Sequence, residues 1–293
     1  MPELPEVEAL CRFLSANAVG LVVERAEVVS FAVLKTVGIL PQDLVGRRVE
    51  SVVRRGKFIG VELGVVGGGE PVWLVAHLAK AGWLRWRDDM LPQPARPSRG
   101  PLAFRLVFVG GHGFDLTEAG TRQRLAVYLV RELADVPGIA SLGPEPLDGS
   151  FTTAVLDAIL DSAGGAQIKG VLRDQHNIAG IGNAYSDEIL WAAGLSPFAA
   201  AGRMNRDQRD GLYAAIGSTL RAAIDQADGL GTGELKAEKK AGLQVHAKAG
   251  QPCPRCGATI AEVSFAESSL QYCPTCQTGG RLLADRRLSR LLK

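Results

Sequence analysis

Four cysteines in the C-terminal part of the chain have the spacing of a metal site. Cys253 and Cys256 form one Cys-x-x-Cys pair, and Cys273 and Cys276 form a second pair after sixteen intervening residues. Each pair can present two thiolates from a tight turn, so that four sulfur ligands surround one tetrahedral Zn²⁺ ion. Because four thiolates leave no position for water, we expect a structural zinc that stabilises a segment too short for its own core. The alternatives are two disulfides or a redox pair.

The N-terminus offers a possible nucleophile. Removal of Met1 would expose Pro2 as a secondary amine. An α-amine has a pKa of about 7.7–8.0, so roughly a quarter of it is unprotonated near neutral pH. Such an amine can attack the sugar C1′ of a flipped nucleotide, expel the base and leave a Schiff base. Glu3, Glu6 and Glu8 supply carboxylates for acid and base roles, although these residues also form an ordinary acidic helix start.

The first half of the chain predicts one helix followed by short strands. Apolar residues at spacings of three and four predict a helix over Glu6–Ala18, with Pro5 in its first turn and Cys11 on its apolar face. From about Leu21 to Thr117, short segments rich in Val, Leu and Phe alternate with glycine-rich breaks. This pattern is typical of a sandwich or barrel of short strands, and we expect Cys11 to be a core residue.

After the turn-rich stretch Leu142–Leu147 the pattern becomes helical. Apolar periodicity predicts four helices, at Phe151–Ala163, Ile168–Asp174, Asn183–Ala193 and Arg206–Gln226. A third unit begins near Leu243 and contains the cysteines. The expected domains are a β-rich N-terminal domain at 1–135, a helical domain at 136–240, a zinc finger at 241–280 and a basic tail at 281–293.

Composition limits the class of protein only loosely. The chain has 293 residues, of which 46% are hydrophobic, and a formal net charge of +2. No apolar run approaches the roughly 20 residues of a membrane span, and the N-terminus lacks a signal-peptide pattern, so we expect a cytoplasmic protein. The net charge is too small to indicate nucleic-acid binding, but residues 242–293 carry seven basic side chains against three acidic ones.

Seven segments of different character follow one another along the chain. They are MPELPEVE at the N-terminus, Arg54–Lys57, His77-Leu78 with Gly82, Leu142–Leu147, Ile168-Lys169, Gly180–Tyr185, and Leu243–His246 before the cysteines. In this order they resemble the formamidopyrimidine-DNA glycosylase and endonuclease VIII family over nearly the whole length of the chain.

The resemblance implies an α+β fold with an N-terminal antiparallel β-sandwich, a helical helix-two-turn-helix domain and a C-terminal four-cysteine zinc finger. It also implies a base-excision-repair DNA glycosylase with abasic-site lyase activity, which removes oxidised bases from double-stranded DNA. Pro2 would be the nucleophile, Glu3 the acid–base residue, and Lys57 a positive contact near the scissile phosphates. We expect a monomer with one structural Zn²⁺ and no redox or nucleotide cofactor.

The resemblance carries DNA-binding roles onto further residues. They are His77, Lys80, Arg122, Arg124, Lys169 and Asn183. Lysine is a point charge suited to phosphate, and Asn183 is a credible N-cap at a helix end that can face a phosphate. Without the resemblance, Lys57 and Lys169 would be solvated surface lysines, His77 a structural histidine, and Gly180–Asn183 a tight turn between helices.

The sequence departs from the family pattern at four places. Lys80 occupies the position of a methionine that fills the gap left by the flipped base. Glu118–Arg124 replaces the usual Asp-Pro-Arg-Arg-Phe-Gly segment, with Arg122 or Arg124 as the substitute arginine. Ser268 stands where the finger tip has an arginine, and Gly229–Gly242 is shorter than the segment that caps oxidised guanine. The preference between oxidised purines, oxidised pyrimidines and bare abasic sites is therefore open.

The second hypothesis is a DNA-binding protein that is not an enzyme. The same scaffold could recognise damaged or abasic DNA without cutting it. A non-catalytic binder has no need of the amine and carboxylate pair at Pro2 and Glu3, or of Lys57, so these residues favour the enzyme. A metalloenzyme is a third hypothesis, and it fails if the metal has four sulfur ligands.

Overall fold

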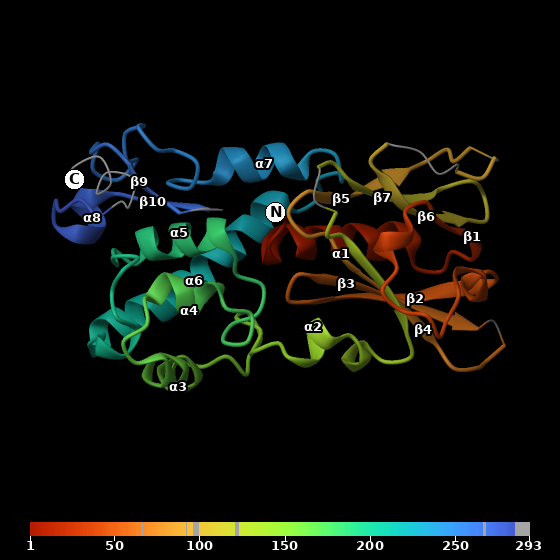
Figure 1. Cartoon of the computed structure of the whole chain (residues 1–293), viewed down its shortest axis with the longest axis horizontal. Helices are drawn as coiled ribbons and strands as arrows, with labels where there is room; N and C mark the ends of the chain where they lie inside the picture. The colour runs from red at the N-terminus through yellow and green to blue at the C-terminus, as the bar shows by residue number, and fades with distance from the viewer. Residues whose placement is uncertain (66, 92, 96–99, 121–122, 266–267, 285–293) are drawn as a thin grey trace. The chain divides into compact units, whose positions relative to one another are not determined.

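A computed structural model describes the chain except residues 66, 92, 96–99, 121–122, 266–267 and 285–293 (Figure 1). The chain divides into two compact units. The N-terminal unit comprises residues 1–141 and 227–237, and the C-terminal unit comprises 142–226 and the residues from 238 onward. Among the described residues, no helix is long and apolar enough to cross a membrane.

The N-terminal unit is a sandwich of two antiparallel four-stranded sheets, as the alternating segments predict. The strands are β1 (Val23–Val28), β2 (Arg47–Arg55), β3 (Phe58–Val65), β4 (Val72–His77), β5 (Gly82–Arg87), β6 (Leu102–Phe108), β7 (Gly113–Glu118) and β8 (Ala126–Val130). One sheet has the order β1-β6-β7-β5 and the other β2-β3-β4-β8. Strand β8 lies beyond the expected strand region, because a five-residue apolar run gives no period by which to recognise a strand.

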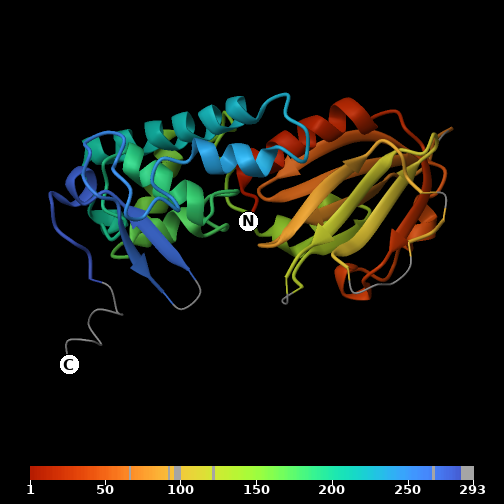
Figure 2. The same cartoon turned by 90° about the horizontal axis from the view of Figure 1, so that it is seen from above.

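Helix α1 (Leu4–Ala18) belongs to the same core as both sheets. Leu10 and Leu14 are completely buried, and Cys11 is 4% exposed, so the prediction that Cys11 is a core residue is confirmed. In Figure 2, α1 runs along one side of the sandwich. Packing one apolar face of the helix against β2 and β3 fixes the N-terminal end of the chain relative to those strands.

The segment 227–237 packs with the sandwich, whereas the expected domain boundaries placed it in the helical domain. The Trp83 indole donates a hydrogen bond to the Thr232 carbonyl at 2.7 Å, and the Trp86 amide donates to the Thr232 hydroxyl at 3.2 Å. Leu235 is 1% exposed and belongs to the core of the sandwich. A linear reading of the sequence could not find this return of the chain, because buried contacts alone define it.

The C-terminal unit contains the predicted helices, with boundaries within two residues of those expected. They are α3 (Thr153–Ala163), α4 (Ile168–Arg173), α5 (Asn183–Ala192) and α6 (Arg206–Ala227). The short helices α2 (Pro137–Ala140) and α7 (Leu235–Gly242) were not expected. Strands β9 (Ala261–Ser264) and β10 (Ser269–Tyr272) form an antiparallel hairpin between the two cysteine pairs, and α8 (Pro274–Thr278) follows it.

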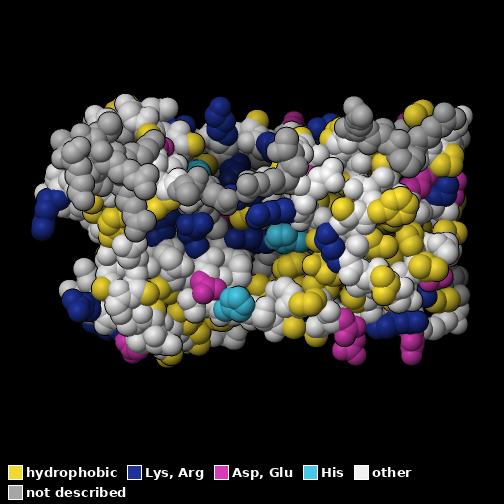
Figure 3. Space-filling view, in the orientation of Figure 1, with side chains coloured by type: hydrophobic (Ala, Val, Ile, Leu, Met, Phe, Trp, Pro, Cys, Tyr) yellow, Lys and Arg dark blue, Asp and Glu magenta, His cyan; other side chains and the backbone are white. Residues whose placement is uncertain are grey.

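The face shown in Figure 3 carries hydrophobic side chains exposed over the strands of the N-terminal unit, together with Lys and Arg side chains. Phe31 and Val37 are the most exposed large apolar residues of the described chain, at 86% and 94%. They lie in the connection between β1 and β2, which includes the 3₁₀ turns Phe31–Val33 and Pro41–Leu44.

The connection between β4 and β5 is a tight turn that carries Lys80 at the surface. The Gly82 amide donates to the Leu78 carbonyl at 2.9 Å, and Ala79 has a positive φ of 51°. A Cβ on residue 82 would lie 2.1 Å from the Leu78 carbonyl oxygen. Since a backbone atom cannot rotate away, the turn requires glycine at this position.

Gly82→Ala should therefore destabilise the N-terminal unit by roughly 3 kcal/mol, the upper end for overpacking. Urea unfolding followed by tryptophan fluorescence measures this, because Trp83 and Trp86 lie in the strand that Gly82 begins, β5. Gly38→Ala is the matched control, since a Cβ there has no neighbour within 4 Å. Equal unfolding midpoints for the two variants would contradict the proposed clash.

Candidate active site and metal centre

The N-terminal residues are built into the fold. Pro2 is buried, and Glu3, which is 2% exposed, has an extended backbone immediately before α1. The Glu3 amide donates to Glu6 Oε2 at 2.8 Å. The Glu6 carboxylate therefore satisfies one of the unpaired amides at the start of the helix and fixes the backbone next to Pro2. Pro2 and Glu3 thus occupy a defined, largely dry position.

Lys57 lies in the two-residue loop of the β2–β3 hairpin. Arg55 pairs with Phe58 on either side of the loop, and Gly56 has a φ of +53°. Two-residue hairpin loops need this left-handed conformation at their first central position, which explains the glycine before the lysine. Lys57 is only 7% exposed, whereas a solvated lysine at a strand end would be largely exposed.

His77 lies beside this lysine. It pairs with Phe58 across β3 and β4, and the two rings are 4.7 Å apart. Burial, assisted by the positive charge of Lys57, lowers the pKa of His77 to about 4. The imidazole is therefore neutral at neutral pH and carries one hydrogen-bond donor and one acceptor. The structure thus brings together two of the residues that the sequence singled out, Lys57 and His77.

The loop after β7 contains the two arginines proposed for DNA binding. Arg122 lies outside the described residues, and Arg124 is exposed. The buried Glu118 carboxylate accepts hydrogen bonds from the amides of Arg124 and Leu125 at 2.8–3.1 Å. Glu118 therefore anchors the end of this loop, a role that the sequence analysis missed because nothing in the local pattern marks an acid as buried.

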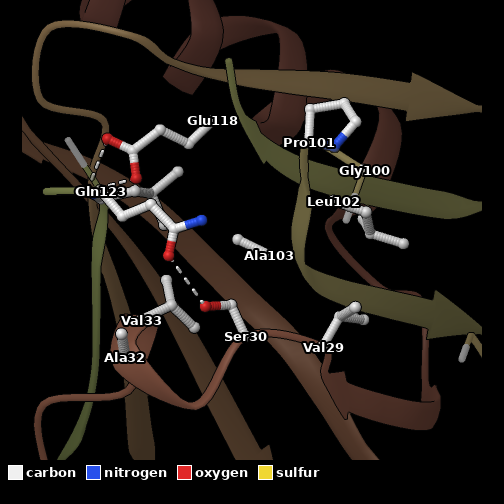
Figure 4. Close-up of a pocket in the computed structure, with 11 residues that line it drawn as sticks. Val29, Ser30, Ala32, Val33, Gly100, Pro101, Leu102, Ala103, Glu118 and Gln123 are labelled. Carbon is white, nitrogen blue, oxygen red and sulfur yellow. Dashed lines mark hydrogen bonds between the residues drawn. The ribbon is translucent and has the colours of Figure 1, made fainter. Parts of the chain in front are cut away.

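A small cavity with a volume of about 110 Å³ lies next to this loop. Figure 4 shows the residues that line it. Glu118 and Gln123 line it together with Ser30, whose hydroxyl donates to Gln123 Oε1 at 3.4 Å. The contact ties the connection after β1 to the loop that carries Arg124. The residues that line the cavity thus help to hold the loop in place.

In the C-terminal unit, the turn before α5 is closed by Gln175. Its side-chain amide accepts from the Gly180 amide at 3.0 Å and donates to the Ile181 carbonyl at 2.7 Å. The residue at the N-cap of α5 is Gly182, so the expectation that Asn183 caps the helix was wrong. Asn183 is instead the first helical residue, and its side chain donates to the Ser269 carbonyl of β10 at 2.8 Å.

Lys169 is 5% exposed and makes a buried ion pair. Its ammonium donates to Asp187 Oδ1 at 2.6 Å, to the Ser186 hydroxyl at 2.8 Å and to the Asn183 carbonyl at 3.1 Å. An ammonium has three N–H donors, and three acceptors surround it. Its contact with DNA remains a prediction, and the lysine has a clear structural role at the first turn of α5.

Two acidic residues of α5 bind the segment that leads into the cysteines. Asp187 Oδ2 lies 2.7 Å from His246 Nδ1 and accepts from the Gln271 amide at 3.3 Å. The Glu188 carboxylate accepts from the amides of three successive residues, 244–246, at 2.8–2.9 Å. Burial raises the pKa of Glu188, and these three amides oppose that rise. The acids were missed because helical periodicity places them in α5 without showing what they face.

The four cysteine sulfurs form a compact cluster in which all Sγ atoms lie within 4.8 Å of one another. Cys253 and Cys276 are 4.0 Å apart, and Cys256 and Cys273 are 3.4 Å apart. A tetrahedral zinc with Zn–S bonds of about 2.3 Å requires sulfurs about 3.8 Å apart, whereas a disulfide requires about 2.05 Å. The cluster therefore fits one structural zinc with four thiolate ligands and fits neither disulfide.

Family models match three consecutive parts of the chain. They are the formamidopyrimidine-DNA glycosylase N-terminal domain over residues 1–126, the formamidopyrimidine-DNA glycosylase H2TH domain over 142–233, and the zinc finger found in FPG and IleRS over 250–279. A sandwich, a helix-two-turn-helix unit and a four-cysteine finger in this order define a class of base-excision-repair enzymes that bind DNA.

Individual relatives agree with these matches. The chain is 32% identical to the formamidopyrimidine-DNA glycosylase of Desulforamulus reducens, covering 94% of this chain and 99% of the relative. It is 54% identical over 161 residues to an uncharacterised formamidopyrimidine-DNA glycosylase-like protein of Mycobacterium tuberculosis, covering 55% of this chain and 100% of the relative. The chain belongs to the formamidopyrimidine-DNA glycosylase family, whose members are bifunctional DNA glycosylases and abasic-site lyases.

Solved structures show the same fold. The Lactococcus lactis enzyme bound non-covalently to DNA with an abasic site has a TM-score of 0.79 and 28% identity, covering 94% of this chain and 99% of that chain. MutM in complex with DNA that contains carbocyclic 8-oxo-G has a TM-score of 0.81 and 27% identity, covering 94% of this chain and 100% of that chain.

Removal of the metal should unfold the hairpin β9–β10 and release one zinc per chain. The finger has only a small core of its own, so the metal supplies much of its folding free energy. Metal analysis and circular dichroism before and after chelation measure both effects. Cys273→Ser should lose the zinc, whereas Cys11→Ser, in the core of the other unit, should retain it. Full zinc content in the Cys273 variant would contradict the assignment.

Lys169→Met should destabilise the C-terminal unit by about 3–5 kcal/mol, because it leaves the Asp187 carboxylate buried without its cation. Chemical denaturation measures the free energy of unfolding. Arg206→Met is the control, since it removes exposed ion pairs with Asp157 and Asp210 and should leave the unfolding midpoint nearly unchanged. Similar effects of the two substitutions would argue against the structural role of Lys169.

Proposed function

We propose that this chain removes oxidised bases from double-stranded DNA and cleaves the strand at the resulting abasic site through the amine of Pro2. The burial of Pro2 and Glu3 carries the proposal. An ordinary acidic helix start would leave these residues in water, whereas a nucleophile and its acid–base partner need a fixed, dry position. Related enzymes crystallised with abasic, 8-oxo-G, Fapy-dG and oxidised-pyrimidine DNA agree with this substrate class.

In the proposed reaction, Met1 is removed and the Pro2 nitrogen attacks C1′ of the damaged nucleotide. The new N–C1′ bond replaces the glycosidic bond, and the base leaves with a proton. Glu3 follows Pro2 directly and is the proposed acid–base residue. The C1′–O4′ bond then breaks, O4′ takes a proton, and the nitrogen lone pair forms the C1′=N Schiff base. Loss of a proton from C2′ breaks the C3′–O bond and releases the 3′ phosphate, and hydrolysis of the Schiff base releases the amine.

The DNA contacts form the second part of the proposal. Lys57 would hold a phosphate near the reacting sugar, with neutral His77 beside it as a hydrogen-bonding group. Lys80 and Arg124 are exposed on supported turns and would contact the duplex. Asn183 and Lys169 lie at the N-terminus of α5, where backbone amides favour an anion, and they would help to bind a DNA phosphate there. We propose that the enzyme works as a monomer. Its DNA substrate would lie in the bacterial cytoplasm.

Lys80 suggests that this protein differs from its relatives in lesion preference. An ammonium in the gap left by a flipped base would favour hydrogen-bond acceptors, where an apolar side chain would only fill space. An abasic duplex is therefore the substrate that tests the chemistry without depending on the base.

Borohydride should trap a covalent complex between the protein, once Met1 is removed, and a duplex with a single abasic site. Selective acylation of the Pro2 amine should abolish trapping and cutting while DNA binding persists, because an amide nitrogen cannot form a Schiff base. Glu3→Gln should slow base removal from an oxidised-base duplex by about 10²–10⁴-fold, because it removes a general acid–base group. Glu24→Gln is the control and should leave base removal unchanged, because Glu24 is an exposed residue of strand β1.

Absence of a cross-link from processed, zinc-loaded protein that still binds the duplex would favour the second hypothesis, a damage-binding protein without catalysis. Unchanged cutting by protein with an acylated Pro2 amine would remove Pro2 from the mechanism while leaving the enzyme class intact.

A further inference from the structure

Arg54, at the end of β2, connects the helix that carries the N-terminus to the turn that carries Lys57. Its side chain is 11% exposed, although arginine is usually a surface residue. Its Nε donates to Glu8 Oε2 of α1 at 2.9 Å, and its Nη1 donates to the Gly56 carbonyl at 3.2 Å. One guanidinium thus holds two elements that are far apart in sequence.

The acceptor on the loop side is the peptide between Gly56 and Lys57. In a two-residue hairpin loop this peptide has no partner in the strand ladder, so its orientation depends on other contacts. The hydrogen bond from Arg54 fixes the carbonyl and with it the direction in which the Lys57 backbone leaves the turn. A planar guanidinium is pre-organised for two such bonds, which a flexible ammonium is not.

The acceptor on the helix side is Glu8, one turn after the start of α1 at Leu4. Glu8 also accepts from Arg12 at 3.2 Å, but the Arg12 side chain is 50% exposed and does not reach the loop. The same carboxylate therefore has one exposed partner and one largely buried partner. Of these two partners, the buried one, Arg54, also donates a hydrogen bond to the turn that carries Lys57.

We propose that Arg54 is a positioning residue for the reaction, because it sets the Lys57 turn at a fixed place relative to the α1 terminus that bears Pro2 and Glu3. The inference rests on the proposed function. Displacement of a phosphate-binding group by about 1 Å can cost about 100-fold in rate even where folding is intact. The brace of Glu8, Arg54 and the Gly56 carbonyl prevents this displacement.

The test compares Arg54→Met, Arg54→Lys and Arg12→Met as full-length, zinc-loaded proteins with Met1 removed. Single-turnover cleavage and borohydride trapping on an abasic duplex measure the chemical step, and duplex affinity and thermal unfolding are measured in parallel. Arg54→Met should slow cleavage by roughly 10- to 100-fold with duplex affinity changed less than about threefold. Arg54→Lys keeps the pair with Glu8 and should recover part of the rate.

Arg12→Met removes a guanidinium from the same carboxylate and should cleave within about twofold of the parent rate. Cleavage by Arg54→Met at the parent rate would overturn the inference, as would equal losses in the Arg54 and Arg12 variants. If Arg54→Met is unfolded, Arg54→Lys decides, since a folded lysine variant with the parent rate and pH profile would also overturn it. A parent protein that neither cuts nor cross-links would instead overturn the proposed function, and this inference with it.

Discussion

A chain terminus can do chemistry only if it is held still, and the hydrogen bond from the Glu3 amide to the Glu6 carboxylate is central to holding the start of this chain. End residues normally fray, since the first amides of a helix have no partner within it. Here the carboxylate three residues on supplies the partner, and the apolar face of α1 anchors the helix in the core of the sandwich. The position of Pro2 therefore follows from the packing of α1, and each element that touches α1 contributes to the candidate site.

Arginine and lysine pairs have different environments in the two units. Arg54 is 11% exposed and its partner Glu8 is 25% exposed, so this pair keeps some contact with water. The side chains of Lys169 and Asp187 are 6% and 0% exposed, and their desolvation is offset by their ion pair and by hydrogen bonds to Ser186, Asn183 and His246. The first pair joins α1 to the Lys57 turn at the edge of the solvent, whereas the second makes α4, α5 and the segment before the cysteines one structural platform.

Two residues at which the sequence departs from the family pattern, Lys80 and Arg124, lie on elements with defined backbone support. Lys80 lies on a turn that Gly82 makes compact, and Arg124 follows a loop end that Glu118 anchors. Both residues thus lie on turns with a well-defined backbone, which agrees with function residing on loops positioned by a rigid scaffold.

The sequence by itself determined the zinc site, the helices and the class of fold, because each depends on local spacing. Cys-x-x-Cys pairs, helical periodicity and alternating strands are properties of neighbouring residues, and the structure confirms them at Cys253–Cys276 and at Arg206–Ala227. Tertiary structure alone decided the burial of Glu3 and Lys169, the anchoring role of Glu118 and the brace at Arg54. Charged residues look alike in a sequence, and only the contacts that remove them from water distinguish a structural ion pair from a solvated surface.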